Sequence, residues 1–275
     1  MNNVLIVARK EIQEGLRNRW VLATTGLLAA LALTLTFLGS APTGTVGAND
    51  LDVVIVSLSS LSVFLIPLIA LLISHDAIVG ELERGTMLLL LSYPIGRWQV
   101  IAGKFVGHLA ILAFATLTGY GAAALALWAT GSVIDGSSWI AYVSLMLSSV
   151  VLGAVFVGIG YLISVLVRER GTAGGVAIGI WLLFVLIYDM ALLGLLVLDQ
   201  GRTVGGDVLN ALLLANPTDV YRLFNLGSGS VGALSGMGGI AESAALPPSV
   251  LMFALLAWAL IPTTAAASIF SRREL

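Results

Sequence analysis

The chain has 275 residues, of which 59% are hydrophobic and 10% are charged, with a formal net charge of −2 and no cysteine. A soluble domain carries about 25% charged residues, so this composition excludes a soluble protein and predicts one that is embedded in a lipid bilayer. With no cysteine and only two histidines, the chain cannot build disulfides, thiolate-bound metals or a zinc or copper centre on its own, and we expect no cofactor in it.

Residues 1–19 are predicted to form an interfacial helix that lies on the membrane, because Val4, Ile12 and Leu16 recur near helical spacing between charged side chains. The apolar run 20–38 that follows is predicted to be the first span. It is long enough to cross a bilayer, whereas the apolar core of a signal peptide has only about 7–15 residues. This length argues against the alternative that residues 1–19 begin a cleaved signal peptide.

Further apolar runs are also long enough to cross a bilayer. With the first run they predict an all-α integral membrane protein with six transmembrane helices, which form a single transmembrane domain over residues 1–275. The expected spans are 20–38, 53–74, 105–128, 139–167, 172–198 and 249–270, and residues 199–248 form the largest outer segment. Pro67 lies inside the second span, where it predicts a kink or, alternatively, a gating hinge.

The charge-bearing stretch Ser74–Gly107 separates the second and third spans. Its acidic and basic residues balance, so we expect no nucleic-acid partner and favour docking by shape. Gly85 is predicted to end one short helix and Thr86 to cap the next, which runs through Ser92 and stops before Pro94. The second helix is mostly apolar from Met87 to Leu91, so it needs a place to bury itself. That place is a protein groove or, alternatively, the bilayer surface.

The positive charges are distributed unevenly over the connecting segments. The sequence has 13 Lys and Arg residues, and only Arg202 and Arg222 fall in segments assigned to the outside. By the positive-inside rule both termini and the Ser74–Gly107 stretch are expected in the cytoplasm.

Three parts of this stretch, Glu81–Thr86, Leu90–Arg97 and Gly103-Lys104, resemble the signature of ABC-2-type permeases. In that family the region is a coupling helix that docks into a groove on a separate cytoplasmic ATPase, which binds ATP and magnesium. The turn at Arg168–Gly171 resembles a second, smaller contact to the ATPase. The resemblance implies that the ATPase-coupling residues are Glu81, Glu83, Arg84, Gly85, Thr86, Met87, Leu90, Leu91, Pro94, Arg97, Arg168 and Arg170.

The chain carries no catalytic motif of its own. It has no G-x-x-x-x-G-K-[ST] phosphate loop, no H-E-x-x-H and no G-x-S-x-G elbow. We therefore expect a non-catalytic subunit whose energy comes from a partner.

Over nearly its full length the chain is similar to one branch of the family, the membrane subunits of NosDFY-type transporters, which support copper-centre maturation of nitrous-oxide reductase. The residues that carry this similarity are Ala8–Glu11, Gly15–Trp20, Asp76–Glu81, Gly103–His108 and Asn216–Arg222. The similarity implies a homodimer in the bacterial inner membrane, two copies of a cytoplasmic ATPase and an extracytoplasmic copper-handling protein. Because the methionines are scattered and cysteine is absent, a Cu(I) pathway through the spans is hard to build, which favours a mechanical role.

In the outer segment, Asn216 as N-cap and Pro217 at the first helical position predict a helix over Pro217–Leu226. We hypothesise that this helix belongs to a lid or to a dock for the extracytoplasmic partner; the alternative is plain anchoring at the interface. The residues assigned to this outer partner dock are Asn216, Asp219, Tyr221, Arg222 and Phe224.

Three glycines, Gly171, Gly175 and Gly179, recur at intervals of four in the fifth span. They permit a close helix approach, either within the subunit or across a homodimer axis. His108 is expected to hydrogen-bond to a neighbouring helix. Asp189 is expected near the outer interface, hydrated rather than part of a conduction path.

Three other function classes remain open from the residues alone. The first is an exporter of a small or sulfur-containing substrate, which would transport it with only the ATPase present. The others are a transporter driven by an ion gradient and an intramembrane enzyme. The ion-gradient transporter would work without any ATPase and would be expected to have helices broken at mid-membrane; the inverted internal repeat seen in such transporters is not visible in the sequence. The intramembrane enzyme would need polar side chains that face each other at mid-membrane, and these are not found.

Overall fold

The computed structural model describes residues 3–17, 19–39, 50–129, 136–199, 205–227 and 246–273. Within these ranges the regular structure is helical, as the composition predicts. The helices are α1 (Asn3–Arg17), α2 (Arg19–Gly39), α3 (Asp50–Ser74), α4 (Val79–Glu83), α5 (Thr86–Leu91), α6 (Arg97–Ala129), α7 (Gly136–Leu166), α8 (Arg170–Leu182), the π-helical segment η1 (Leu183–Ile187), α9 (Tyr188–Asp199), α10 (Gly206–Leu214), α11 (Pro217–Leu226) and α14 (Pro248–Arg272).

Five of the predicted spans correspond to helices that are long and apolar enough to cross a membrane, counted over the described residues. The first predicted span lies in α2, where the apolar helical stretch Ala23–Thr36 is shorter. The third span was predicted to begin at 105, but α6 begins at Arg97, because its amphipathic first turns are helical without being apolar. The fifth span is interrupted by the π-helical turn η1, for which the apolar sequence gives no signal.

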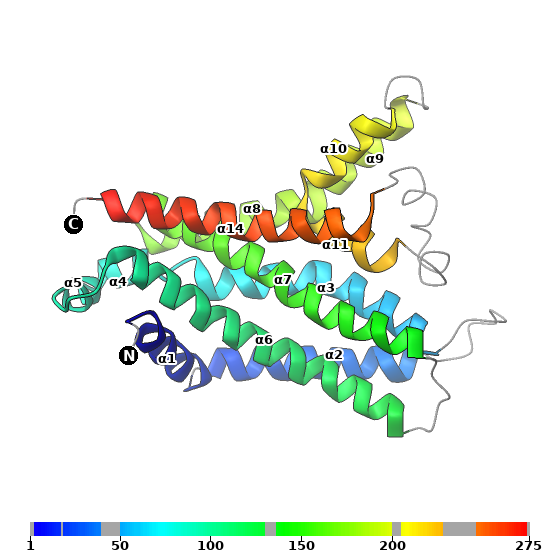
Figure 1. Cartoon of the computed structure of the whole chain (residues 1–275), viewed down its shortest axis with the longest axis horizontal. Coiled ribbons are helices and arrows are strands. Elements are labelled where there is room, and N and C mark those ends of the chain that lie inside the picture. Colours follow the sequence, from blue (N-terminus) through cyan, green and yellow to red (C-terminus); the bar gives the residue numbers. More distant parts are fainter. Residues whose placement is uncertain are drawn as a thin grey trace.

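The long helices form an elongated bundle with α7 at its centre, packed against α3 and α14 (Figure 1). The apolar residues on most sides of α7 are buried, from Leu152 to Val165, as expected for a helix that is hydrophobic all round. The helix α1, the pair α4 and α5 and the C-terminal end of α14 all lie at one end of the bundle (Figure 1). We call this the coupling end.

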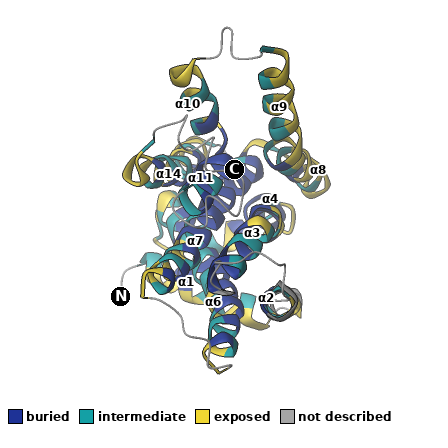
Figure 2. Cartoon of the chain, turned by 90° about the vertical axis from the view of Figure 1, so that its right-hand side faces the viewer, coloured by how far each residue is buried: buried dark blue, intermediate teal, exposed yellow. Residues whose placement is uncertain are grey.

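The helices α9 and α10 both project away from the bundle (Figure 1), and they stand apart from each other (Figure 2). No residue of α9 is buried, and in α8 only Ala173 and Ala177 are. By contrast, α11 is enclosed between α3, α7 and α14. One long apolar surface, along α8 and α9, is therefore left without a partner inside the described chain.

Candidate functional site

The break between α4 and α5 is made by Gly85, whose φ of +72° is left-handed. An L-residue in this region pays about 1–2 kcal/mol, so glycine suits the position. The turn is closed by Thr86, whose Oγ1 donates to the Glu81 carbonyl at 3.3 Å. Two short helices are thus present at the predicted place, but the predicted cap is wrong: Gly85 is the N-cap of α5 and Thr86 is its first helical residue.

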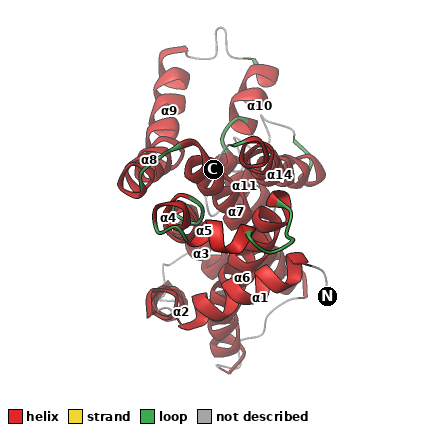
Figure 3. Ribbon diagram, turned by 90° about the vertical axis from the view of Figure 1, so that its left-hand side faces the viewer, coloured by secondary structure: helices red, strands yellow, loops and turns green. Residues whose placement is uncertain are grey.

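One face of α5 points outward at the coupling end, where α5 crosses in front of the bundle (Figure 3). Met87 is fully buried, whereas Leu88 and Leu89 are 59% and 69% exposed. The predicted contact residues Leu90 and Leu91 are half-buried and pack against the core. Leu88 and Leu89 are thus the leucines that a partner would meet. Four consecutive leucines carry no periodicity that could have distinguished them.

Beside α5 lies a hollow of ≈ 430 Å³ lined by Lys10 and Glu14 of α1 together with Thr86, Leu89 and Tyr93. The Tyr93 side chain is exposed. The coupling end therefore presents exposed apolar side chains next to a recess, a shape suited to contact with another protein.

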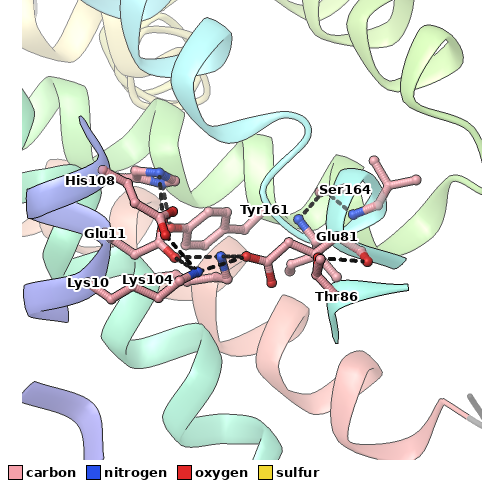
Figure 4. A network of polar contacts seen from close by, with 11 residues as sticks. Lys10, Glu11, Glu81, Thr86, Lys104, His108, Tyr161 and Ser164 are labelled. Atoms are coloured by element: carbon pink, nitrogen blue, oxygen red, sulfur yellow. Dashed lines mark hydrogen bonds and ion pairs between the residues drawn. The ribbon is translucent and has the colours of Figure 1, made fainter. Parts of the chain in front are cut away.

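Behind α5, a buried ion-pair cluster joins three helices (Figure 4). Lys104 of α6 donates to Glu11 Oε1 of α1 at 2.7 Å and to Glu81 Oε1 of α4 at 2.8 Å. Lys10 donates to the same Glu81 oxygen at 3.3 Å. The side chain of Lys104 is only 2% exposed, so water cannot replace these contacts. Glu81, assigned to the ATPase contact by the resemblance, lies inside the subunit and fixes α4 to α6 and α1.

The charges of this cluster stabilise one another. Burial acts to raise the pKa of Glu11, but the ammonium of Lys104 and the other nearby positive groups outweigh it and hold that pKa below its ordinary value. For Lys10, burial acts to lower the pKa, and the carboxylates of Glu81, Glu11 and Glu14 raise it overall. Both shifts favour the charged forms of Glu11 and Lys10.

The helix α1 approaches α6 closely at two glycines. A Cβ on Gly103 would lie 2.6 Å from Val7 Cβ and 2.8 Å from the Val4 carbonyl oxygen, and one on Gly107 would lie 2.6 Å from Glu11 Cβ. These contacts require the absence of a side chain. One residue further along, Tyr161 of α7 bonds to His108 Nδ1 at 2.7 Å, which confirms the expected bond between His108 and a neighbouring helix.

The helix α4 is also held to α7 and α8. Ser164 Oγ accepts hydrogen bonds from the backbone N–H groups of Ile78 and Val79, each at 3.0 Å, which satisfies free donors at the start of the helix. A serine near the end of a span was no visible signal for this role.

On the other side of α4, Glu83 Oε1 accepts from the backbone N–H of Arg170 at 2.7 Å. The Arg170 guanidinium pairs with Asp76 at 2.8 Å. The two predicted contact regions, around α4–α5 and around Arg168–Arg170, are therefore brought together, and Arg168 and Arg84 stay exposed beside them.

Pro94 lies in the linker from α5 to α6, and Arg97 is the first residue of α6. Arg97 donates to the carbonyls of Phe270 and Arg273 at the end of α14, so its guanidinium is used inside the subunit. Pro94 is exposed, and its carbonyl accepts from Asn3 Nδ2 at 3.2 Å.

The predicted outer residues gather on α11, whose bounds match the predicted helix. Asn216 caps the helix by accepting from Thr218 N at 3.1 Å, and Tyr221 bonds to Ser149 of α7 at 2.8 Å. Both are fully buried, and Asp219 is 5% exposed. Only Arg222 and Phe224 of the set are half-buried.

Asp189 is not a lone hydrated group, because Arg222 pairs with it and with Asp219. Burial raises the pKa of Asp219 to about 7, with a further contribution from the nearby Asp189 carboxylate. The sequence analysis missed the Asp189–Arg222 pair, which joins α9 to α11. In the described ranges no three Asp, Glu, His or Cys side chains gather as a metal site.

The glycines Gly171, Gly175 and Gly179 all lie on the exposed side of α8. A Cβ at any of them would meet nothing within 4 Å. Of the two roles that the sequence left open, close packing within the subunit therefore has no contact to support it in the described chain.

Comparison with known proteins gives a consistent result. A family model described as "ABC-2 family transporter protein" matches residues 5–275. A protein from Stutzerimonas stutzeri named "Probable ABC transporter permease protein NosY" is 49% identical over 276 residues, which cover 99% of each chain. A protein of the same name from Pseudomonas aeruginosa strain PAO1 is 45% identical over 273 residues, again with 99% of each chain covered.

Proposed function

This chain belongs to the ABC-2 family of transporter proteins, and from that premise we propose that it couples a cytoplasmic ATPase to copper-centre maturation of nitrous-oxide reductase outside the membrane. It is the permease subunit of an ABC transporter. The maturation role rests on its similarity to the two NosY proteins, and the mechanical character of the coupling rests on the arrangement at the coupling end.

The observation that carries the proposal is the outward apolar face of α5, which follows a helix, α4, that is held to α6 and α8 by side-chain contacts. Leu88 and Leu89 are exposed, and an apolar helix of this kind fits a groove on a partner. Behind them, Glu81 is locked by Lys104 and Glu83 by the backbone of Arg170. A displacement of α5 by nucleotide-driven movement of the ATPase would therefore be passed to α6, α7 and α8 together.

The exposed side of α8 and α9 is proposed as the contact with a second copy of the chain. Gly171, Gly175 and Gly179 form a flat strip there with no neighbour within 4 Å. Small residues in such a strip allow helices in a membrane to pack closely. A homodimer would bring two α5 helices to two ATPase subunits in the cytoplasm, with both termini of each copy on that side of a bacterial inner membrane.

The outer partner is proposed to dock over α11 and the adjoining α9–α10 pair. Arg222 and Phe224 offer the accessible surface. Asn216 and Tyr221 hold α11 in the bundle, and Asp219 bonds to Arg222 within the helix. The partner, a copper-handling protein, would thus bind a helix that is anchored to the spans and would move with them.

The test removes the exposed leucines of α5 and leaves the contacts of Glu81 and Glu83 unchanged. Leu88→Ala with Leu89→Ala is expected to reduce co-purification of the ATPase with the membrane-inserted chain at least tenfold, which corresponds to about 1.4 kcal/mol. The copper content of nitrous-oxide reductase in the same cells should fall with it. The matched control is Leu5→Ala with Leu16→Ala, which are exposed leucines of α1 at the same end.

Unchanged ATPase capture in the α5 variant, or equal loss in the control, would contradict the proposal. If reconstituted vesicles with only this chain and its ATPase transported a small sulfur compound, the exporter alternative would replace it.

A further inference from the structure

A cavity of ≈ 480 Å³ lies at the coupling end, between α1 and α2 on one side and α3, α4 and the start of α8 on the other. Part of its wall is apolar and comes from α3 and α6, with Leu72, Ile73 and Ile111. The rest is charged and includes Glu14 and Arg84. The apolar part lies where α3 ends and the charged stretch begins, which is the level of a membrane interface in the proposed orientation.

Two charged groups that line the cavity have unused bonding capacity. Glu81 is only 8% exposed, and its Oε2 is buried without a hydrogen-bond partner in the described structure, while Oε1 accepts from Lys10 and Lys104. A buried polar atom left unsatisfied costs about 1–3 kcal/mol, so a donor is expected there. Arg84 is exposed, and its backbone N–H bonds to the Gly80 carbonyl, but its guanidinium makes no hydrogen bond or ion pair with a described residue.

The charge balance of the lining indicates what kind of ligand fits. It contains the carboxylates of Glu11, Glu14, Asp76 and Glu81 and the cationic groups of Arg84, Lys104 and Arg170. Lys104 is already neutralised by Glu11 and Glu81, and Arg170 pairs with Asp76. What remains is a carboxylate oxygen that needs a donor and a guanidinium that needs an anion. A ligand that carries both charges satisfies both needs.

We propose that this cavity binds the headgroup of a zwitterionic phospholipid that bears a primary ammonium group. The ammonium has three N–H donors. They suit Glu81 Oε2 and also the carboxylate of Glu14, which is 61% exposed, pairs only at 3.5 Å with Lys10 and can accept a second donor. The phosphate suits Arg84, whose planar guanidinium binds such oxygens in a bidentate way. The acyl chains run along the apolar wall, where Leu72 lines the cavity and is 52% exposed. This inference needs only a chain in a membrane and does not depend on the proposed coupling.

The test is lipid retention by the purified full-length chain, measured by native mass spectrometry after titration with lipids of identical acyl chains. Phosphatidylethanolamine is expected to be retained about tenfold better than phosphatidylglycerol, a ratio that corresponds to one charge-assisted contact. Phosphatidylcholine, which has a positive charge but no N–H, should also bind more weakly than phosphatidylethanolamine. Soluble O-phosphoethanolamine alone should not bind measurably, because it lacks the chains.

Two variants separate the two halves of the headgroup. Glu14→Gln is expected to reduce the preference for phosphatidylethanolamine over phosphatidylglycerol, and Arg84→Gln to reduce retention of all three lipids. The matched control is Arg9→Gln, an exposed arginine of α1 outside the cavity lining, which should leave retention unchanged.

Equal retention of the three lipids, or loss in Arg9→Gln as large as in Arg84→Gln, would overturn the proposal, since it would indicate only general lipid or surface-charge binding. Tight binding of O-phosphoethanolamine would also overturn it, because the occupant would then be a soluble zwitterion. A dimer that retains no lipid would also overturn the proposal, because a second copy of the chain would then close the cavity.

Discussion

Replacing Lys104 by methionine tests whether the buried charges hold the coupling end together. Methionine keeps the length of the side chain but removes the ammonium between Glu11 and Glu81. Because Lys104 is 2% exposed and its two partners are 8% and 11% exposed, water cannot solvate the carboxylates left behind. Removing one partner of a buried ion pair costs about 3–5 kcal/mol.

Thermal unfolding of the purified full-length chain in detergent measures this cost. At roughly 2–4 °C for each kcal/mol in a chain of 150–250 residues, the midpoint is expected to fall by roughly 6–20 °C. The control is Lys10→Met, because the side chain of Lys10 is 42% exposed. Solvent screens such a charge, so its loss should cost less than about 1 kcal/mol.

A triple variant separates charge from packing. Glu11→Gln, Lys104→Met and Glu81→Gln together leave no buried charge, and replacing a whole buried ion cluster is often close to neutral. The triple variant should therefore recover at least half of the loss. If Lys104→Met shifts the midpoint by no more than Lys10→Met, the cluster contributes little. If the triple variant is as unstable as the single one, the loss comes from packing.

Two further variants test other parts of the structure. Asp219→Asn should flatten the pH dependence of stability. Burial raises the pKa of Asp219 to about 7, so this carboxyl binds its proton more tightly in the folded chain than in the unfolded one. Its contribution to stability is therefore largest below the unfolded pKa near 4 and falls as the pH rises toward 7. Thermal unfolding midpoints of both proteins at pH 5 and pH 8 measure this, and the same pH dependence in the variant and the original chain would refute it. Gly175→Leu should abolish the proposed dimer but keep the thermal midpoint of the monomer, because a Cβ there meets nothing within 4 Å inside the subunit. Light scattering on the purified chain measures the oligomeric state, and a variant that stayed dimeric would contradict the prediction. The control is Gly26→Leu on α2, where a Cβ also meets nothing within 4 Å.

The parts of the fold that follow from local signals could be predicted from the sequence. Asn216 and Pro217 fix the start of α11 because the cap and the proline act on neighbouring backbone groups. Gly85 marks the break between α4 and α5 because only glycine adopts its backbone conformation at low cost. The long apolar helices follow from long apolar runs, whereas the start of α6 at Arg97 does not, because its first turns carry polar and charged residues.

The contacts that build the coupling end could not be predicted, because they join residues that are far apart in the chain. Lys104 and Glu11 are 93 positions apart, and Ile78 and Ser164 are 86. A sequence shows that charged residues flank the spans, but it does not show which of them face inward once α1 packs on α6. The assignment of Glu81 to the partner surface, made by resemblance, therefore missed its partner inside the subunit. The burial of α11 was missed for the same reason, since it depends on how α3, α7 and α14 surround it.

The structure also provides a continuous route from the coupling end to the outer helices. Arg170, held by Glu83 and Asp76, begins α8, which runs into η1. A π-helical turn changes the hydrogen-bonding pattern of a helix and is often found at functional positions. Here the carbonyl of Phe184 within η1 accepts hydrogen bonds from Asn216 Nδ2 at 3.0 Å and Thr218 Oγ1 at 3.1 Å.

The start of α11 is thus fastened to the one irregular turn in the fifth span. A route of this kind transmits a signal only if one of its elements has two stable arrangements. In this route η1 is the element that departs from regular α-helical bonding, and Asp189, which pairs with Arg222 of α11, follows it directly. For the mechanical coupling proposed above, η1 is therefore the element to test for two arrangements, because its Phe184 carbonyl is bound by the side chains at the start of α11.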